Sequence, residues 1–113
     1  MKSYQLYIFL NEDVRVQIGK LGVFSFPKGN YIYTGSAKRN IEKRIERHLS
    51  SNKKLHWHID YLLENSHTKI VKTRKTNFFE CHLNKNTAGN KIILGFGSSD
   101  CKKNCGSHLK YVS

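Results

Sequence analysis

The first third of the chain alternates apolar and polar positions with a period of two. Residues 4–10 (YQLYIFL) follow this pattern, and both of the faces that it creates are largely apolar. Two apolar faces are typical of a central strand that is covered on both sides of its sheet. Residues 14–18 and 24–27 predict further extended segments, and 31–35 predict a strand rich in aromatic and β-branched residues.

The period changes to that of a helix after residue 40. Residues 40–50 carry one apolar stripe that recurs every four positions. The stripe consists of Ile41, Ile45 and Leu49. Asn40 is a suitable N-cap for this helix. Arg44 and His48 fall along one border of the stripe, whereas Arg47 falls farther round, toward water.

The second half of the chain mixes helical and extended patterns. We expect a second helix over about 55–65, a strand over 68–74 and a short helix over 77–85. Residues 95–113 form a tail that contains glycine and cysteine. This order predicts a single α+β domain over 1–113, with a small, mainly antiparallel sheet of three or slightly more strands flanked by helices.

Charge narrows the choice of partner. The 113 residues include 20 Lys and Arg against 8 Asp and Glu, for a net charge of +12. Such a surface favours polyanions through counterion release, which indicates nucleic acid without distinguishing an enzyme from a binding module. No apolar run approaches the ~18 residues of a membrane span, and no signal-peptide profile is present, so we expect a soluble, cytoplasmic protein.

The most informative segment is residues 31–49 (YIYTGSAKRNIEKRIERHL). A strand ends in Tyr33-Thr34-Gly35, a tight Gly-Ser-Ala turn follows, and the helix then presents Arg44 and His48. Here the chain resembles the GIY-YIG nuclease family, in which a Tyr-x-Gly strand end leads into a helix with an Arg and often a His four residues later. The resemblance extends through HWHIDYLL and GFGSSDC to SHL, and is closest to a compact stand-alone branch.

The resemblance implies a three-stranded antiparallel sheet with flanking helices, and hydrolysis of phosphodiester bonds with one divalent cation, Mg²⁺ or Mn²⁺. The residues that match the catalytic positions of the family are Tyr4, Tyr33, Arg44, His48 and Glu80. Tyr4 is the best match to the tyrosine of the first motif, and Tyr7 is a rival. Glu80 matches the metal-binding glutamate. Lys2 stands where the first motif usually opens with glycine, and the late asparagine of many members has no clear counterpart.

These residue types suit the chemistry independently of the resemblance. An arginine such as Arg44 offers a permanently charged fork for phosphate, and a carboxylate such as Glu80 holds a hard cation. A tyrosine relays a proton from water only if positive charge lowers its usual pKa of about 10. The choice between Tyr4 and Tyr33 as this base stays open. In the alternative, purely structural interpretation, Tyr4 and Tyr33 are ordinary strand aromatics and His48 only packs between helix and sheet.

Further basic and aromatic residues are candidates for contacts with nucleic acid. They are Lys38, Arg39, Lys43, Arg47, Lys53, Lys54, Trp57 and His58. Trp57 points away from the inward face of its helix, where it either stacks on a base or packs against the tail.

The three cysteines are an odd number in a chain without a secretory signal, which favours reduced thiols or a metal site over disulfides. Cys101, Cys105 and His108 resemble half of a Zn²⁺ site. Their spacing departs from the usual pairs, so we expect the tail to be a packed cap instead.

The leading hypothesis is therefore a metal-dependent endonuclease that cuts DNA, selective for structure, of the repair or recombination type. A non-catalytic basic module that binds DNA or RNA is the alternative, and a zinc-stabilised interaction domain is a third. The oligomeric state stays open.

Overall fold

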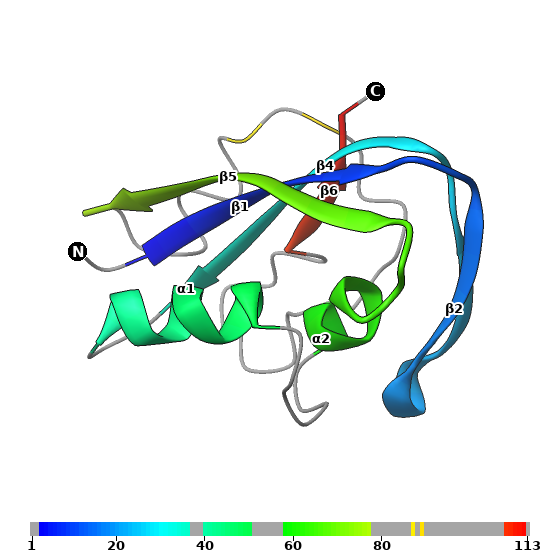
Figure 1. The fold of residues 1–113 in the computed structure, drawn as a ribbon, viewed down its shortest axis with the longest axis horizontal. Helices are drawn as coiled ribbons and strands as arrows, with labels where there is room; N and C mark the ends of the chain where they lie inside the picture. Colours follow the sequence, from blue (N-terminus) through cyan, green and yellow to red (C-terminus); the bar gives the residue numbers. More distant parts are fainter. Residues whose placement is uncertain are drawn as a thin grey trace.

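The centre of the molecule is an antiparallel sheet. The computed structural model describes residues 3–36, 40–50, 58–77, 87, 89 and 108–112. In this part of the chain, four strands pair in the order β5-β1-β4-β6. They are β1 (Ser3–Leu10), β4 (Gly29–Ser36), β5 (Thr68–Thr76) and β6 (Leu109–Tyr111). Helices α1 (Ile41–Leu49) and α2 (His58–Leu63) lie on the same side of this sheet (Figure 1). The predicted α+β domain with a mainly antiparallel sheet is confirmed.

Strand β1 is central, as its pattern predicts, and pairs along its length with β4 and β5. Its alternation sends four apolar side chains toward the helices, each at most 1% exposed. These are Tyr4, Leu6, Ile8 and Leu10. The opposite face is divided, because Ser3 and Gln5 are buried whereas Phe9 is 38% exposed. The expectation that both faces of this strand are covered is therefore wrong at the Phe9 end, since both described helices pack on the Tyr4 side.

A separate two-stranded hairpin projects from the sheet on the right of Figure 1. It consists of β2 (Val14–Ile18), the 3₁₀ turn η1 (Gly19–Leu21) and β3 (Gly22–Phe26). The hairpin folds back onto α2 at Gly19, whose φ is +49°. A Cβ atom at Gly19 would lie 3.2 Å from the Tyr61 hydroxyl, so this contact requires glycine.

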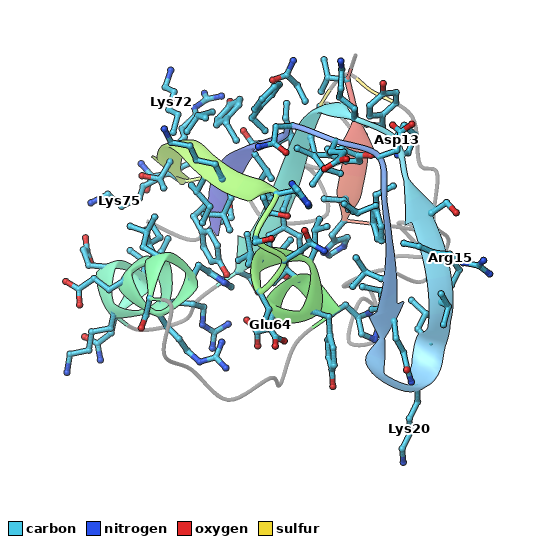
Figure 2. All side chains as sticks on the ribbon, turned by 45° about the vertical axis from the view of Figure 1, so that its right-hand side comes forward. Asp13, Arg15, Lys20, Glu64, Lys72 and Lys75 are labelled. Carbon is cyan, nitrogen blue, oxygen red and sulfur yellow. The ribbon has the colours of Figure 1, made fainter. Side chains whose placement is uncertain are left out.

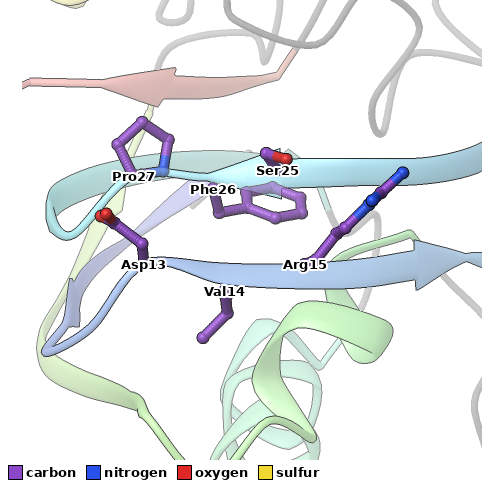
Figure 3. A pocket seen from close by; sticks show the side chains of 6 residues that line it. All are labelled: Asp13, Val14, Arg15, Ser25, Phe26 and Pro27. Carbon is purple, nitrogen blue, oxygen red and sulfur yellow. The ribbon is translucent and has the colours of Figure 1, made fainter.

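The base of the hairpin holds a shallow pocket of about 460 Å³ (Figure 3). It is lined by Asp13, Val14, Arg15, Ser25, Phe26 and Pro27. The backbone N–H of Lys28 donates to the Asp13 carboxylate at 2.6 Å, and the Tyr31 hydroxyl donates to the carbonyl of Pro27. Burial, together with the neighbouring Tyr111 and Asp13, raises the pKa of Tyr31. These two hydrogen bonds connect the base of the hairpin to β4. We therefore assign the pocket a structural role.

Helix α1 is turned relative to its predicted orientation. Ile41 and Ile45 are buried as expected, but Leu49 is 57% exposed and His48 is 2% exposed. On a helical wheel, Ile41, Ile45 and His48 centre on one direction, and Leu49 lies about 80° away from Ile41. Because the helix ends at Leu49, no further helical turn follows that could bring this apolar side chain over the sheet.

Other departures concern the ends of elements. Asn40 occupies the N-cap position with a left-handed φ of +51° and makes no side-chain cap hydrogen bond, so only its predicted place is confirmed. Strand β6 was not predicted, and it makes the end of the tail part of the sheet. The predicted helix over 77–85 and most of the tail lie outside the described residues. No helix in the described part of the chain is long and apolar enough to cross a membrane.

We expect Tyr31→Phe to lower the free energy of unfolding by about 1 kcal/mol, because the hydrogen bond to Pro27 is lost. The raised pKa of Tyr31 also means that, above pH ~10, the unfolded chain ionises this phenol before the folded chain does. Stability is therefore fully present below that pH and falls as the pH rises beyond it. Urea titrations at neutral and alkaline pH test this, and the fall should be shallower in Tyr31→Phe.

Candidate active site

The site begins with a close approach between strands β1 and β4. Tyr4 is paired with Gly35 across the two strands, so both residues face the helices. A Cβ atom on Gly35 would lie 2.5 Å from both the Cζ and the hydroxyl of Tyr4. The Tyr4 phenol therefore lies directly over Gly35, in space that any side chain would fill. This gives the glycine of the Tyr33-Thr34-Gly35 strand end a physical role.

Helix α1 brings His48 to this phenol. The Tyr4 hydroxyl lies 2.6 Å from His48 Nε2, and both side chains are buried. Tyr33 packs edge-on against the same imidazole, with ring centroids 6.1 Å apart. Two tyrosines from two strands thus converge on one histidine, and all three are among the residues that the sequence nominated for catalysis. A short hydrogen bond between phenol and imidazole is a route for proton transfer.

Arg44 lies one helical turn before His48 on the same side of α1. Its guanidinium donates to the backbone carbonyl of Ser36 at the end of β4, and the side chain is half-buried. This contact holds one nitrogen of the fork beside the strand end that carries Gly35. An arginine whose position is fixed by backbone in this way can bind a phosphate group with little loss of side-chain entropy.

Arg47 is placed differently from the prediction. Its guanidinium makes two hydrogen bonds, of 3.0 and 3.1 Å, to the carboxylate of Asp60 on α2. Asp60 is fully buried, and its Oδ1 lies 4.0 Å from His48 Nδ1. The expectation that Arg47 points to water is therefore wrong, because the buried carboxylate draws it in. Arg47 links α1 to α2 beside His48, and its predicted contact with nucleic acid stays a prediction.

Sequence reasoning gave no role to Asp60. It lies about 100° from Ile59 on the helical wheel, beside the apolar stripe of α2 and not on it, so periodicity does not find it. Its importance arises from the packing of α2 on α1, which no local pattern encodes.

Several nominated residues lie elsewhere. Lys43 is exposed on α1 and His58 is half-buried at the start of α2. Glu80 lies outside the described residues, as do the predicted nucleic-acid contacts Lys38, Arg39, Lys53, Lys54 and Trp57. No cluster of three or more His, Cys, Asp or Glu groups suited to a metal ion is found in the described ranges.

His108 is buried at the start of β6, and its backbone carbonyl accepts a hydrogen bond from Thr34 N–H. Its hypothetical Zn²⁺ partners, Cys101 and Cys105, lie outside the described residues, so the zinc prediction stays a prediction.

The family model described as domain of unknown function DUF123 matches residues 3–113. The chain belongs to the DUF123 family. Neither a curated protein nor a solved structure matches it. What this DUF123 domain does must therefore be argued from its own residues.

We expect Gly35→Ala to destabilise this DUF123 domain by about 1–3 kcal/mol, because the new methyl group collides with the Tyr4 ring. In a Tyr4→Ala background the same change should cost much less, since the ring is gone. A double-mutant cycle of chemical denaturation curves measures this coupling. Additive effects of the two substitutions would show that the ring does not lie over Gly35.

We expect Arg47→Ala to destabilise the domain by about 3 kcal/mol, because it leaves the buried Asp60 carboxylate without its ion-pair partner. Lys43→Ala, on the exposed face of the same helix, is the matched control and should change stability by less than about 0.5 kcal/mol. Thermal unfolding measures both. Equal stability of the two variants, with weaker DNA binding by Arg47→Ala, would show that Arg47 contacts nucleic acid instead.

Proposed function

We propose that this domain is a metal-dependent endonuclease of the GIY-YIG type, which hydrolyses phosphodiester bonds in DNA. The observation that carries the proposal is the convergence of Tyr4, Tyr33 and His48, linked by the 2.6 Å hydrogen bond between Tyr4 and His48. These residues come from two strands and a helix. Core packing alone does not call for a phenol that is buried against an imidazole over a glycine.

The arrangement suits the removal of a proton from an attacking water. A phenol keeps its proton at neutral pH and is a weak base, unless a neighbouring group accepts that proton. The neutral imidazole of His48 can accept that proton from Tyr4 across their hydrogen bond. Tyr33, at 6% exposure, is the less enclosed of the two tyrosines and packs edge-on against the same imidazole. The Tyr4 oxygen can then receive the proton of the water as its own proton passes to His48 Nε2.

Arg44 supplies the positive charge that a phosphodiester needs. Its fork is tethered at Ser36, at the end of the strand that carries Tyr33. Charge that develops on the phosphate oxygens in the transition state strengthens their hydrogen bonds to a fixed guanidinium. The net charge of +12 favours the approach of a polyanion.

The proposed ligand of the divalent cation is Glu80, which lies outside the described residues. Asp60, whose Oδ1 lies 4.0 Å from His48 Nδ1, does not suit this role because Arg47 holds both of its oxygens. When bound, a divalent cation neutralises charge that builds up on the phosphate.

We further propose that cutting is selective for DNA structure. A domain of this size buries only ~600–1,000 Å² on its ligand, too little to read a long sequence. Flaps, junctions and damaged sites are recognised through shape and exposed bases over a few nucleotides. Repair and recombination supply such substrates.

The test uses labelled single-stranded, duplex, flap and junction DNA, incubated with Mg²⁺, Mn²⁺ or EDTA. We expect cation-dependent cleavage of at least one branched substrate. Arg44→Ala, Tyr4→Phe and Glu80→Ala should each slow it by about 100-fold or more, because each removes a group needed in the transition state.

Lys20→Ala is the control, since it removes an exposed charge from the hairpin and should keep the cleavage rate within a few-fold. Binding of DNA should survive in Arg44→Ala and Glu80→Ala. Salt-sensitive binding without cleavage of any substrate, with either cation, would instead support the alternative of a non-catalytic nucleic-acid-binding module.

A further inference from the structure

The face of the sheet that points away from the helices has an open end. Tyr7 and Phe9 lie on this face of β1, opposite Lys72 and Lys69 of β5. Phe9 is 38% exposed, Tyr7 is half-buried, and both lysines are exposed. A bulge between Tyr7 and Ile8 adds Val71, which is 55% exposed. We call this surface the open face.

The open face contains an apolar groove of about 330 Å³ beside the Tyr7 ring. The exposed or half-buried side chains that line it are Tyr7, Asn30, Ile32, Val71, Lys72 and Val112. Phe9, Val71 and Val112 are three of the five large apolar side chains that are exposed in the described part of the chain. Apolar side chains gathered in this way mark a binding surface more often than scattered ones do.

The basic side chains on the two faces of the sheet differ in whether they form ion pairs. Toward the helices, Arg47 pairs with Asp60, and Lys75 pairs with Glu42 at 3.1 Å. That contact and the Glu42 backbone N–H lower the pKa of Glu42. On the open face, the side chains of Lys69 and Arg74 make no ion pair or hydrogen bond with the described residues. Figure 2 shows Lys72 pointing away from both helices.

No acidic residue shares this face among the strand residues described. By register, its positions on β5 are Lys69, Lys72, Arg74 and Thr76. In the turn that follows β1, the Glu12 carboxylate lies 3.1 Å from His67 Nε2. The open face is therefore basic as well as aromatic, and it complements a polyanion that also carries flat apolar rings.

We propose that the open face binds single-stranded nucleic acid, with bases stacked on Tyr7 and Phe9 and phosphates held by Lys69, Lys72 and Arg74. The two rings are two residues apart on one strand, about 6.8 Å, which suits consecutive unpaired bases. The Lys72 ammonium lies 5.6 Å from the centre of the Tyr7 ring, within reach of the phosphate of a base on that ring. This surface is separate from the Tyr4–His48 site, on the opposite face of the same strand.

The charge pattern favours this ligand over the two other occupants of an apolar groove. A second copy of the chain would bring a further net charge of +12 against the same lysines. An apolar peptide would contact Tyr7, Val71 and Val112. It would make no favourable charge interaction with the three basic side chains of the open face. A single strand uses both features.

The test measures fluorescence anisotropy of labelled single-stranded DNA, single-stranded RNA and duplex DNA of about 12 nucleotides. EDTA replaces divalent cations, so the result does not depend on whether the helix-side site cuts DNA. We expect single strands to bind more tightly than the duplex. Either single-stranded polymer supports the proposal, and the tighter one identifies the ligand class.

Phe9→Ala should weaken binding by about 5-fold or more, since it removes one stacking platform. Lys72→Gln should reduce the slope of log K against log salt by about 0.7, the value for one phosphate contact on a single strand. The matched controls are Val23→Ala, an exposed apolar residue of the hairpin, and Lys20→Gln at its tip. Figure 2 shows Lys20 at the end of the hairpin, far from Lys72, and both variants should bind like the unmodified chain.

Two outcomes would overturn the proposal. The first is equal binding by the open-face variants and their controls, which would reduce the interaction to net charge. The second is concentration-dependent self-association in sedimentation that Phe9→Ala abolishes, which would make the open face a contact between copies of the chain. Circular dichroism of every variant establishes that the compared proteins are folded.

Discussion

The Tyr4 ring lies over Gly35, and the rest of the site follows from this one close approach. Because position 35 has no side chain, the Tyr4 phenol can occupy the space over Gly35 and still reach helix α1. Its hydroxyl then meets His48, which is buried where an apolar residue would be expected. The orientation of α1 is a consequence, since the helix presents His48 to the sheet and leaves Leu49 exposed.

A second layer of polar contacts keeps that histidine in place. Arg47 and Asp60 join α1 to α2 directly behind it, with Asp60 fully buried. A buried ion pair adds little net stability, because desolvation offsets most of the attraction. It does restrict how two helices pack, since a shift of either one would leave a buried charge alone. The imidazole thus has the Tyr4 hydroxyl 2.6 Å from Nε2 and the Asp60 carboxylate 4.0 Å from Nδ1.

The central strand separates two kinds of chemistry. Toward the helices, β1 contributes Tyr4 to an enclosed site that suits proton transfer. Away from them, it contributes Tyr7 and Phe9 to an open, basic surface. Period-two alternation makes this division possible, because successive residues of one strand face opposite sides. A protein that cuts structured DNA benefits from both, since unpaired bases can be held on one face while the other reacts. That combination is what the two proposals together describe.

The sequence by itself determined most of the described elements and nominated the catalytic candidates. Alternation in 4–10 and four-residue spacing in 40–50 are local signals, and they placed β1 and α1 correctly. The Tyr33-Thr34-Gly35 strand end with Arg44 and His48 was also readable, because these residues lie close together in the chain. Only the tertiary structure decided that Arg47 forms an ion pair with Asp60, that the Phe9 side chain is exposed and that Leu109–Tyr111 adds a strand to the sheet. Each of these depends on which distant segment packs against which face, and residue spacing carries no information about that choice.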